Sequence, residues 1–130
     1  MQLALDDAHV SAREIGYINT HGSSTPLNDS TETLAIKKVF GDHAYDIPLS
    51  GTKGYYGHAL GASGAIEAAI CALAMEREWL PPTVNLSVAD DACDLNFLPV
   101  TGKKARVEHM LSNSFGFGGI NAALVLRRVM

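Results

Sequence analysis

A lysine, a histidine and a carboxylate stand close together in one glycine-rich stretch, GTKGYYGHALGASGAIE, at residues 51–67. Glu67 lies in an apolar run that carries no other charge until Glu76. A carboxylate in a buried apolar helix needs a cation or several hydrogen-bond donors, and the nearest cation along the chain is Lys53. We therefore predict a buried ion pair between Lys53 and Glu67, beside His58.

Two further stretches with glycines carry side chains suited to chemistry. NTHGSSTP, at residues 19–26, places His21 at the end of a short β-prone run, and GFGGIN, at residues 116–121, places Phe117 among glycines. Glycines beside one large side chain suit a loop in which that side chain moves while a backbone N–H reaches a ligand. A phosphate site is disfavoured, because the loop lacks both the GxGxxG spacing and the strand-to-helix context of a dinucleotide site.

Residue types alone leave the roles of these side chains open. A histidine after a strand is more often a structural hydrogen-bonding residue than a general base, a metal ligand or an oxyanion donor. This applies to His21 and His58, and no second-shell spacing supports a metal site at either. Lys53 would be a surface residue at even odds if Glu67 did not call for a partner.

The elements that must position these residues alternate between strands and helices, which predicts an α/β layer with a mixed sheet flanked by helices. We predict helices at residues 1–9, 29–41 and 57–78, strands at 15–20 and 47–50, and a hairpin of 107–113 with 120–129. Asp29 and Glu32 predict a capping-box start for the second helix. The third helix is apolar nearly all round, which predicts that it is buried. We expect residues 83–99 to be irregular, with a short edge strand at 95–98 and outward-facing Asp90, Asp91 and Asp94.

Taken together, the three motifs resemble those of the β-ketoacyl-acyl-carrier-protein synthases. The spacing of Lys53, His58 and Glu67 matches the family's condensing site, NTHGSSTP is similar to its NAHGTSTP signature, and GFGGIN is similar to its GFGGTN loop. Ile120 stands where the family usually has threonine, so one hydroxyl is missing. The resemblance covers almost the whole chain. It implies a thiolase-like fold, of which residues 1–130 would be the C-terminal portion, without the N-terminal half.

The resemblance implies a role for each candidate residue. His21 and His58 would donate hydrogen bonds to the thioester oxygen of malonyl-carrier protein and stabilise the enolate that remains when carbon dioxide departs. Lys53 would set the electrostatics around His58 without reacting, and Glu67 would orient Lys53.

The glycine-rich loop would then contain a gate. By resemblance, Phe117 closes the acyl pocket and its backbone N–H lines the oxyanion hole, with Gly116 and Gly118 on either side. The family's nucleophilic cysteine belongs to the N-terminal half. Cys71 is expected to be a core residue, and carboxylates around Cys93 would raise the pKa of its thiol. We expect the isolated chain to hold half an active site and to be inactive.

The function implied by the resemblance is that of a 3-oxoacyl-[acyl-carrier-protein] synthase, which joins malonyl-carrier protein to an acyl thioester by decarboxylative Claisen condensation in fatty acid biosynthesis. Two alternatives stay open. One is a ketosynthase domain of a polyketide synthase. The other is a non-catalytic partner similar to a chain-length factor, against which the retained His21, His58 and Lys53 argue. The implied partners are acyl carrier protein, malonyl and acyl thioesters, and a second copy in a homodimer of the full-length protein; no cofactor is implied.

Composition excludes several other classes. The chain has 130 residues, of which 47% are hydrophobic and 18% charged, as expected for one globular domain. The net charge is −4 and no cluster of basic residues stands out, which argues against a protein that binds nucleic acid. Residues 59–75 are nearly long and apolar enough for a membrane-spanning helix, but Glu67 lies in their middle. We therefore expect a buried helix and no membrane span. The first residues do not form a signal sequence, so we expect a cytoplasmic location.

Overall fold

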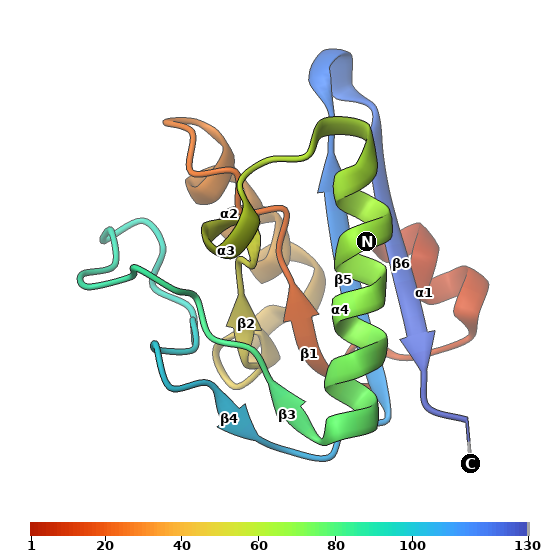
Figure 1. Cartoon of the computed structure of the whole chain (residues 1–130). Coiled ribbons are helices and arrows are strands. Elements are labelled where there is room, and N and C mark those ends of the chain that lie inside the picture. Colours follow the sequence, from red (N-terminus) through yellow and green to blue (C-terminus); the bar gives the residue numbers. More distant parts are fainter. Residues whose placement is uncertain (130) are drawn as a thin grey trace.

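A four-stranded mixed sheet forms the centre of the computed structural model, which describes residues 1–129 (Figure 1). The strand order is β2-β1-β5-β6, with β2 at Leu49–Ser50, β1 at Ile15–Asn19, β5 at His109–Phe115 and β6 at Asn121–Arg127. β1 runs parallel to β2 and to β5, and β5 runs antiparallel to β6. The predicted mixed sheet and the predicted hairpin are therefore confirmed.

Helices cover both faces of this sheet (Figure 1). α1 (Gln2–Ala8) and α2 (Asn28–Phe40) pack on one face, where buried side chains from both helices meet the sheet in a core that includes Leu5, Ile18, Ile36 and Leu111. α4 (Ser63–Arg77) crosses the other face, over a second core that includes Tyr17, Cys71, Met75 and Met110. No helix in residues 1–129 is long and apolar enough to cross a membrane.

Short elements complete the chain. α3 (Lys53–Tyr56) is a single helical turn after β2. β3 (Trp79–Leu80) and β4 (Lys103–Lys104) form a separate two-stranded antiparallel sheet. The 3-10 turns are η1 (Ala12–Glu14), η2 (Gly41–Tyr45), η3 (Leu60–Ala62) and η4 (Phe117–Gly119). Residues 83–99 are irregular, as predicted, and Asp90, Asp91 and Asp94 are exposed. The edge strand predicted at 95–98 is reduced to one isolated bridge, between Leu49 and Phe97.

The helix predicted at residues 57–78 differs from the structure in extent and in burial. Gly57, at φ 77°, ends α3, and the next long helix starts only at Ser63. One stripe of α4 is buried, through Glu67, Cys71 and Ala74, whereas Leu73 on the outer side is 53% exposed. The prediction of a helix buried all round is wrong for this chain, because a single sheet covers only one side of a helix.

Candidate active site

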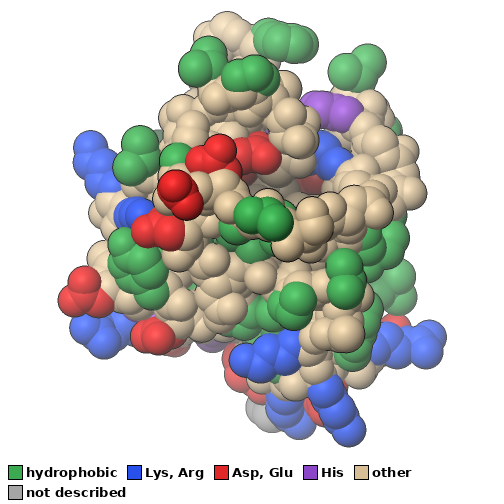
Figure 2. All heavy atoms as spheres, turned by 90° about the vertical axis from the view of Figure 1, so that its left-hand side faces the viewer, with side chains coloured by type: hydrophobic (Ala, Val, Ile, Leu, Met, Phe, Trp, Pro, Cys, Tyr) green, Lys and Arg blue, Asp and Glu red, His purple; other side chains and the backbone are tan. Residues whose placement is uncertain are grey.

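The site begins where β1 and β2 end. The carboxyl ends of parallel neighbouring strands meet at the same edge of a sheet. The backbone N–H of Thr20 donates to the carbonyl of Ser50 at 3.0 Å and keeps the two chains together beyond the strands. β1 thus delivers His21 and β2 delivers Lys53, and both residues are only 6% exposed. Figure 2 shows the hollowed surface at this edge, with histidine and basic side chains visible.

The predicted ion pair is present and buried. The ammonium group of Lys53 donates to Glu67 Oε1 and also to the backbone carbonyl of His21. The two side chains of the pair are 5% and 0% exposed. Lys53 therefore links α4 to the loop that carries His21, and a change at Glu67 reaches the histidine through one side chain.

A third side chain, which the sequence did not single out, joins this pair. Tyr56 lies one helical turn after Lys53 in α3, and its hydroxyl donates to Glu67 Oε1 at 3.3 Å. The same hydroxyl lies 3.4 Å from Thr52 Oγ1. The other carboxylate oxygen, Glu67 Oε2, has no hydrogen-bond partner among residues 1–129. One oxygen thus receives both the ammonium and the phenol.

The rings of His21 and His58 lie close together. The ring centroids of His21 and His58 are 5.3 Å apart and the rings are nearly perpendicular, at 75°. His58 is exposed, and its Nδ1 accepts the backbone N–H of Leu60 at 3.0 Å. In a neutral imidazole, a nitrogen that accepts a hydrogen bond carries no proton, so Nε2 of His58 is the donor.

His21 is held in its neutral form. Burial lowers the pKa of this imidazole to about 4, and the neighbouring charge of Lys53 and the ring of His58 contribute to the decrease. A neutral imidazole keeps one N–H for donation at neutral pH. The ring of Phe115 packs against His21, with centroids 5.7 Å apart.

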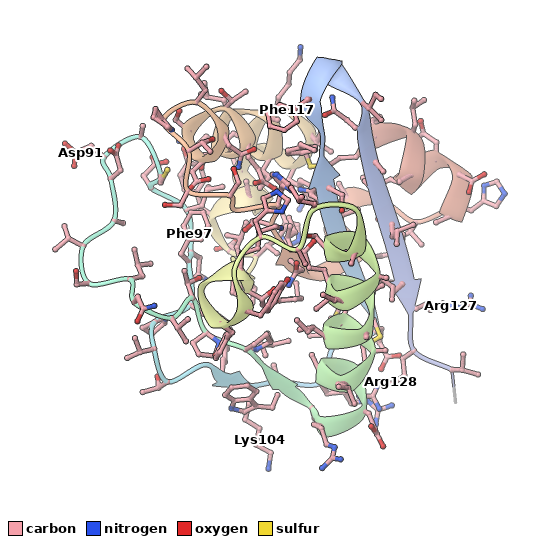
Figure 3. The ribbon with its side chains drawn as sticks, turned by 45° about the horizontal axis from the view of Figure 1, so that its top comes forward. Asp91, Phe97, Lys104, Phe117, Arg127 and Arg128 are labelled. Carbon is pink, nitrogen blue, oxygen red and sulfur yellow. The ribbon has the colours of Figure 1, made fainter. Side chains whose placement is uncertain are left out.

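Phe117 lies outside this cluster. Its side chain is 97% exposed at the turn of the β5–β6 hairpin (Figure 3). Phe117 is therefore not packed against the two histidines, whereas the ring of Phe115 packs against His21. The reason is local: Gly116 donates to the carbonyl of Ile120 at 2.8 Å and Gly118 adopts φ 75°, so the loop turns beyond the last strand pair and projects from the sheet.

Glu32 is a second residue whose role at the site the sequence analysis missed, since it assigned Glu32 to the start of a helix. It is 3% exposed on α2, and its carboxylate accepts the backbone N–H groups of His21 at 2.9 Å and Gly22 at 3.0 Å, and the side-chain amide of Asn113 at 3.0 Å. Burial raises the pKa of Glu32, and these hydrogen bonds oppose the increase. The four-residue spacing that puts Glu32 on the same helix face as Ile36 was the signal available in the sequence.

The predicted capping box at the start of α2 is wrong. The helix begins at Asn28, and its N-cap residue Leu27 has no side-chain hydrogen bond. Glu32 points back to the loop after β1, and Asp29 accepts the backbone N–H of Ser24 at 3.1 Å. Both carboxylates therefore stabilise the loop of His21 and not the helix end.

The two cysteines lie in different surroundings. Cys71 is fully buried on α4, as predicted, and burial raises the pKa of its thiol to about 12, with a further contribution from Glu67. Cys93 is half-buried in the irregular segment. In residues 1–129 no three His, Cys, Asp or Glu side chains are placed to hold a metal ion.

Sequence comparison identifies the family. The model described as "Beta-ketoacyl synthase, C-terminal domain" matches residues 1–87, two thirds of the chain. The chain belongs to the β-ketoacyl synthase family.

Individual relatives of the chain are also β-ketoacyl synthases. The chain is 49% identical over 129 residues to 3-oxoacyl-[acyl-carrier-protein] synthase 2 of Coxiella burnetii, which covers 99% of this chain and 31% of the relative. It is 48% identical over 126 residues to putative polyketide β-ketoacyl synthase 1 of Streptomyces virginiae. The matched region is 97% of this chain and 30% of that relative. The chain therefore spans less than a third of the curated relatives it matches.

Solved structures show the same fold. A β-ketoacyl synthase from Burkholderia phymatum matches the whole chain with a TM-score of 0.93 and 43% identity, over 31% of its own length. A ketosynthase solved in complex with its type II polyketide acyl-carrier protein matches 98% of the chain with a TM-score of 0.95 and 41% identity, again over 31%. The predicted thiolase-like α/β fold is confirmed.

Proposed function

We propose that this chain supplies the malonyl-binding part of the active site of a 3-oxoacyl-[acyl-carrier-protein] synthase, an acyltransferase of fatty acid biosynthesis. The observation that carries the proposal is the pair of imidazole rings of His21, after β1, and His58, after α3, whose centroids lie 5.3 Å apart. Lys53 fixes the loop that carries one of them.

The geometry suits the decarboxylation step. When malonyl thioester loses carbon dioxide, the carbon–carbon bond breaks and its electron pair moves into an enolate, whose charge gathers on the thioester oxygen. Two N–H donors placed for that oxygen stabilise it more than the neutral substrate. Nε2–H of His58 is one donor, and the neutral ring of His21 supplies the other.

The remaining chemistry requires a nucleophile from elsewhere in the full-length protein. The enolate carbon attacks the carbonyl of an acyl thioester, and the thiol of that thioester leaves. Cys71 is unsuited to hold the acyl group, because its thiol is buried and its pKa is raised to about 12. The proposed partners are acyl carrier protein, as in the related polyketide ketosynthase complex, and a second copy of the full-length protein. Phe117, with Gly116 and Gly118, is proposed as the mobile gate over the acyl pocket.

A polyketide synthase is the second candidate, because polyketide ketosynthases match at nearly the same identity as the fatty acid enzyme, 48% against 49%. Comparing chain elongation on fatty acyl and on polyketide carrier proteins separates the two.

The test is release of carbon dioxide from malonyl-carrier protein by the full-length protein. We expect His21→Ala and His58→Ala each to lower the rate by about 10² to 10³, the effect of losing one oxyanion donor. His9→Asn, at the exposed end of α1, is the matched control and should keep the rate. Equal rates in all four proteins would contradict the proposal.

A further inference from the structure

The hydroxyl of Ser63 lies against the ring of His58. Ser63 is the first residue of α4 and is 4% exposed, and its Oγ is 3.2 Å from His58 Nδ1. Because Nδ1 already accepts the N–H of Leu60 at 3.0 Å, it is an unprotonated nitrogen. The Ser63 hydroxyl is therefore the donor in its contact with the ring.

We propose that Ser63 is a positioning residue that, together with the backbone N–H of Leu60, holds the orientation and the tautomer of His58. Its hydroxyl and the Leu60 N–H both donate to Nδ1, which leaves Nε2 as the only nitrogen of the ring that can donate to a substrate oxygen. A catalytic role for this arrangement rests on the proposed function. The tautomer of His58 can be measured whether or not the proposed function is right.

His58 needs such hydrogen bonds because packing does not hold its ring. The residue is exposed, and it lies in the segment between α3 and α4, where Leu60 adopts φ 50°. In water, an imidazole exchanges between its two tautomers and turns about its bonds. A buried hydroxyl fixed on the first turn of α4 offers a donor that does not move away.

The position of Ser63 also shows that this serine is not present to cap α4. A serine that caps a helix stands at the N-cap, whereas here the N-cap is Ala62 and no side-chain cap bond forms. Alanine has a higher helix propensity than serine, so Ser63→Ala should fold. The variant removes one hydroxyl and leaves the Leu60 N–H in place.

The decisive measurement is the ¹⁵N chemical shifts of the histidine ring nitrogens in protein labelled at histidine, with His58→Gln used to assign the signals. Wild type should show Nε2 protonated and Nδ1 unprotonated. In Ser63→Ala the two shifts should move toward each other, as tautomers mix, and Ser63→Thr, which keeps a hydroxyl, should restore them. Ser30→Ala, a serine on α2 that forms no hydrogen bond with His58, is the matched control. Unchanged His58 shifts in Ser63→Ala would overturn the proposal.

Kinetics provide the second readout. In the full-length protein, Ser63→Ala should lower kcat for decarboxylation of malonyl-carrier protein about twofold to tenfold, the effect of one hydrogen bond, with KM unchanged and with recovery in Ser63→Thr. A kcat equal to that of wild type would overturn the role of Ser63 in catalysis. If wild type releases no carbon dioxide, the proposed function fails while the ¹⁵N result still decides the tautomer.

Discussion

Burial and the charge of Lys53 lower the pKa of His21 to about 4, from an ordinary value of 6.5. Between these two values the unfolded chain binds a proton at His21 that the folded chain does not. Stability therefore falls as the pH decreases from 6.5 toward 4. Urea unfolding at pH 7 and pH 5 should show a smaller loss for His21→Gln than for wild type. His9→Asn is the control for loss of an imidazole, and equal losses in wild type and His21→Gln would contradict the assignment.

The buried pair of Lys53 and Glu67 makes a second prediction at this scale. Removing one partner leaves the other charge buried and unpaired, so Lys53→Met or Glu67→Gln should lower the free energy of unfolding by about 3 to 5 kcal/mol. Replacing both residues together, by Met and Leu, should cost less than either single change. Glu76→Gln, which removes a partner of exposed Arg77, is the control with little effect. A double variant less stable than both single variants would argue against the pair.

Tyr56 extends that network by one hydroxyl. Because its phenol donates to the ionised Glu67, Tyr56→Phe should destabilise the fold by about 1.5 to 3 kcal/mol. Tyr55→Phe changes the same group on a residue that is 53% exposed, and thermal unfolding of the two variants compares them directly. A Tyr56→Phe protein as stable as Tyr55→Phe would show that the hydroxyl contributes nothing.

Residues differ in how far the sequence predicts them. Glu67 was predictable because a lone charge in an apolar run requires a partner, and Lys53 was close by. The spacing of Glu32 and Ile36 indicates only that Glu32 faces the core. Its partner is a backbone N–H eleven residues earlier, which residue types do not reveal. Tyr56 and Ser63 were missed for a related reason: each acts through one hydroxyl, whose partner depends on how the short turns before α4 are folded.

At the scale of elements, α2 holds the loop after β1 through Glu32. In Glu32→Gln one carboxylate oxygen becomes an amide nitrogen, which cannot accept, so one of the two backbone N–H groups loses its partner. We expect a loss of about 1 to 3 kcal/mol and faster hydrogen exchange at His21 and Gly22. Thr31→Ala, exposed on the same helix, is the control. Unchanged exchange at both amides would show that α2 does not hold the loop.

Element prediction succeeded where the pattern is local. β1 and the β5–β6 hairpin follow runs of β-prone residues with glycine at their turn, and α2 ends at Gly41 as expected. The start of α4 was placed six residues too early, because small residues such as Ala59 and Gly61 read as helix although Leu60 turns to φ 50°. The pair of β3 and β4 was missed because two-residue strands carry no period.

At the scale of the whole molecule, the 130-residue chain contains two cysteines, of which Cys71 is buried and Cys93 is half-buried. We expect no covalent adduct when the chain alone is incubated with acyl-carrier protein or a cysteine-directed epoxide and weighed by intact mass spectrometry. Burial and the raised pKa of Cys71 slow its reaction. Cys93 lies in an acidic stretch of the sequence, next to Asp94 and close to Asp90 and Asp91. The full-length protein, which should react, is the positive control. A stoichiometric adduct on either cysteine at neutral pH would contradict the half-site interpretation.

The strand order also sets the time at which the fold can form. β1, near the start of the chain, is paired on one side with β5, so Ile18 lies beside Leu111. During synthesis, more than ninety residues are added after Ile18 before its neighbour Leu111 is made. Contacts of such sequence separation form slowly, because a long loop has to close first. The loop that carries His21 at the end of β1 can therefore become rigid only after β5 has been made.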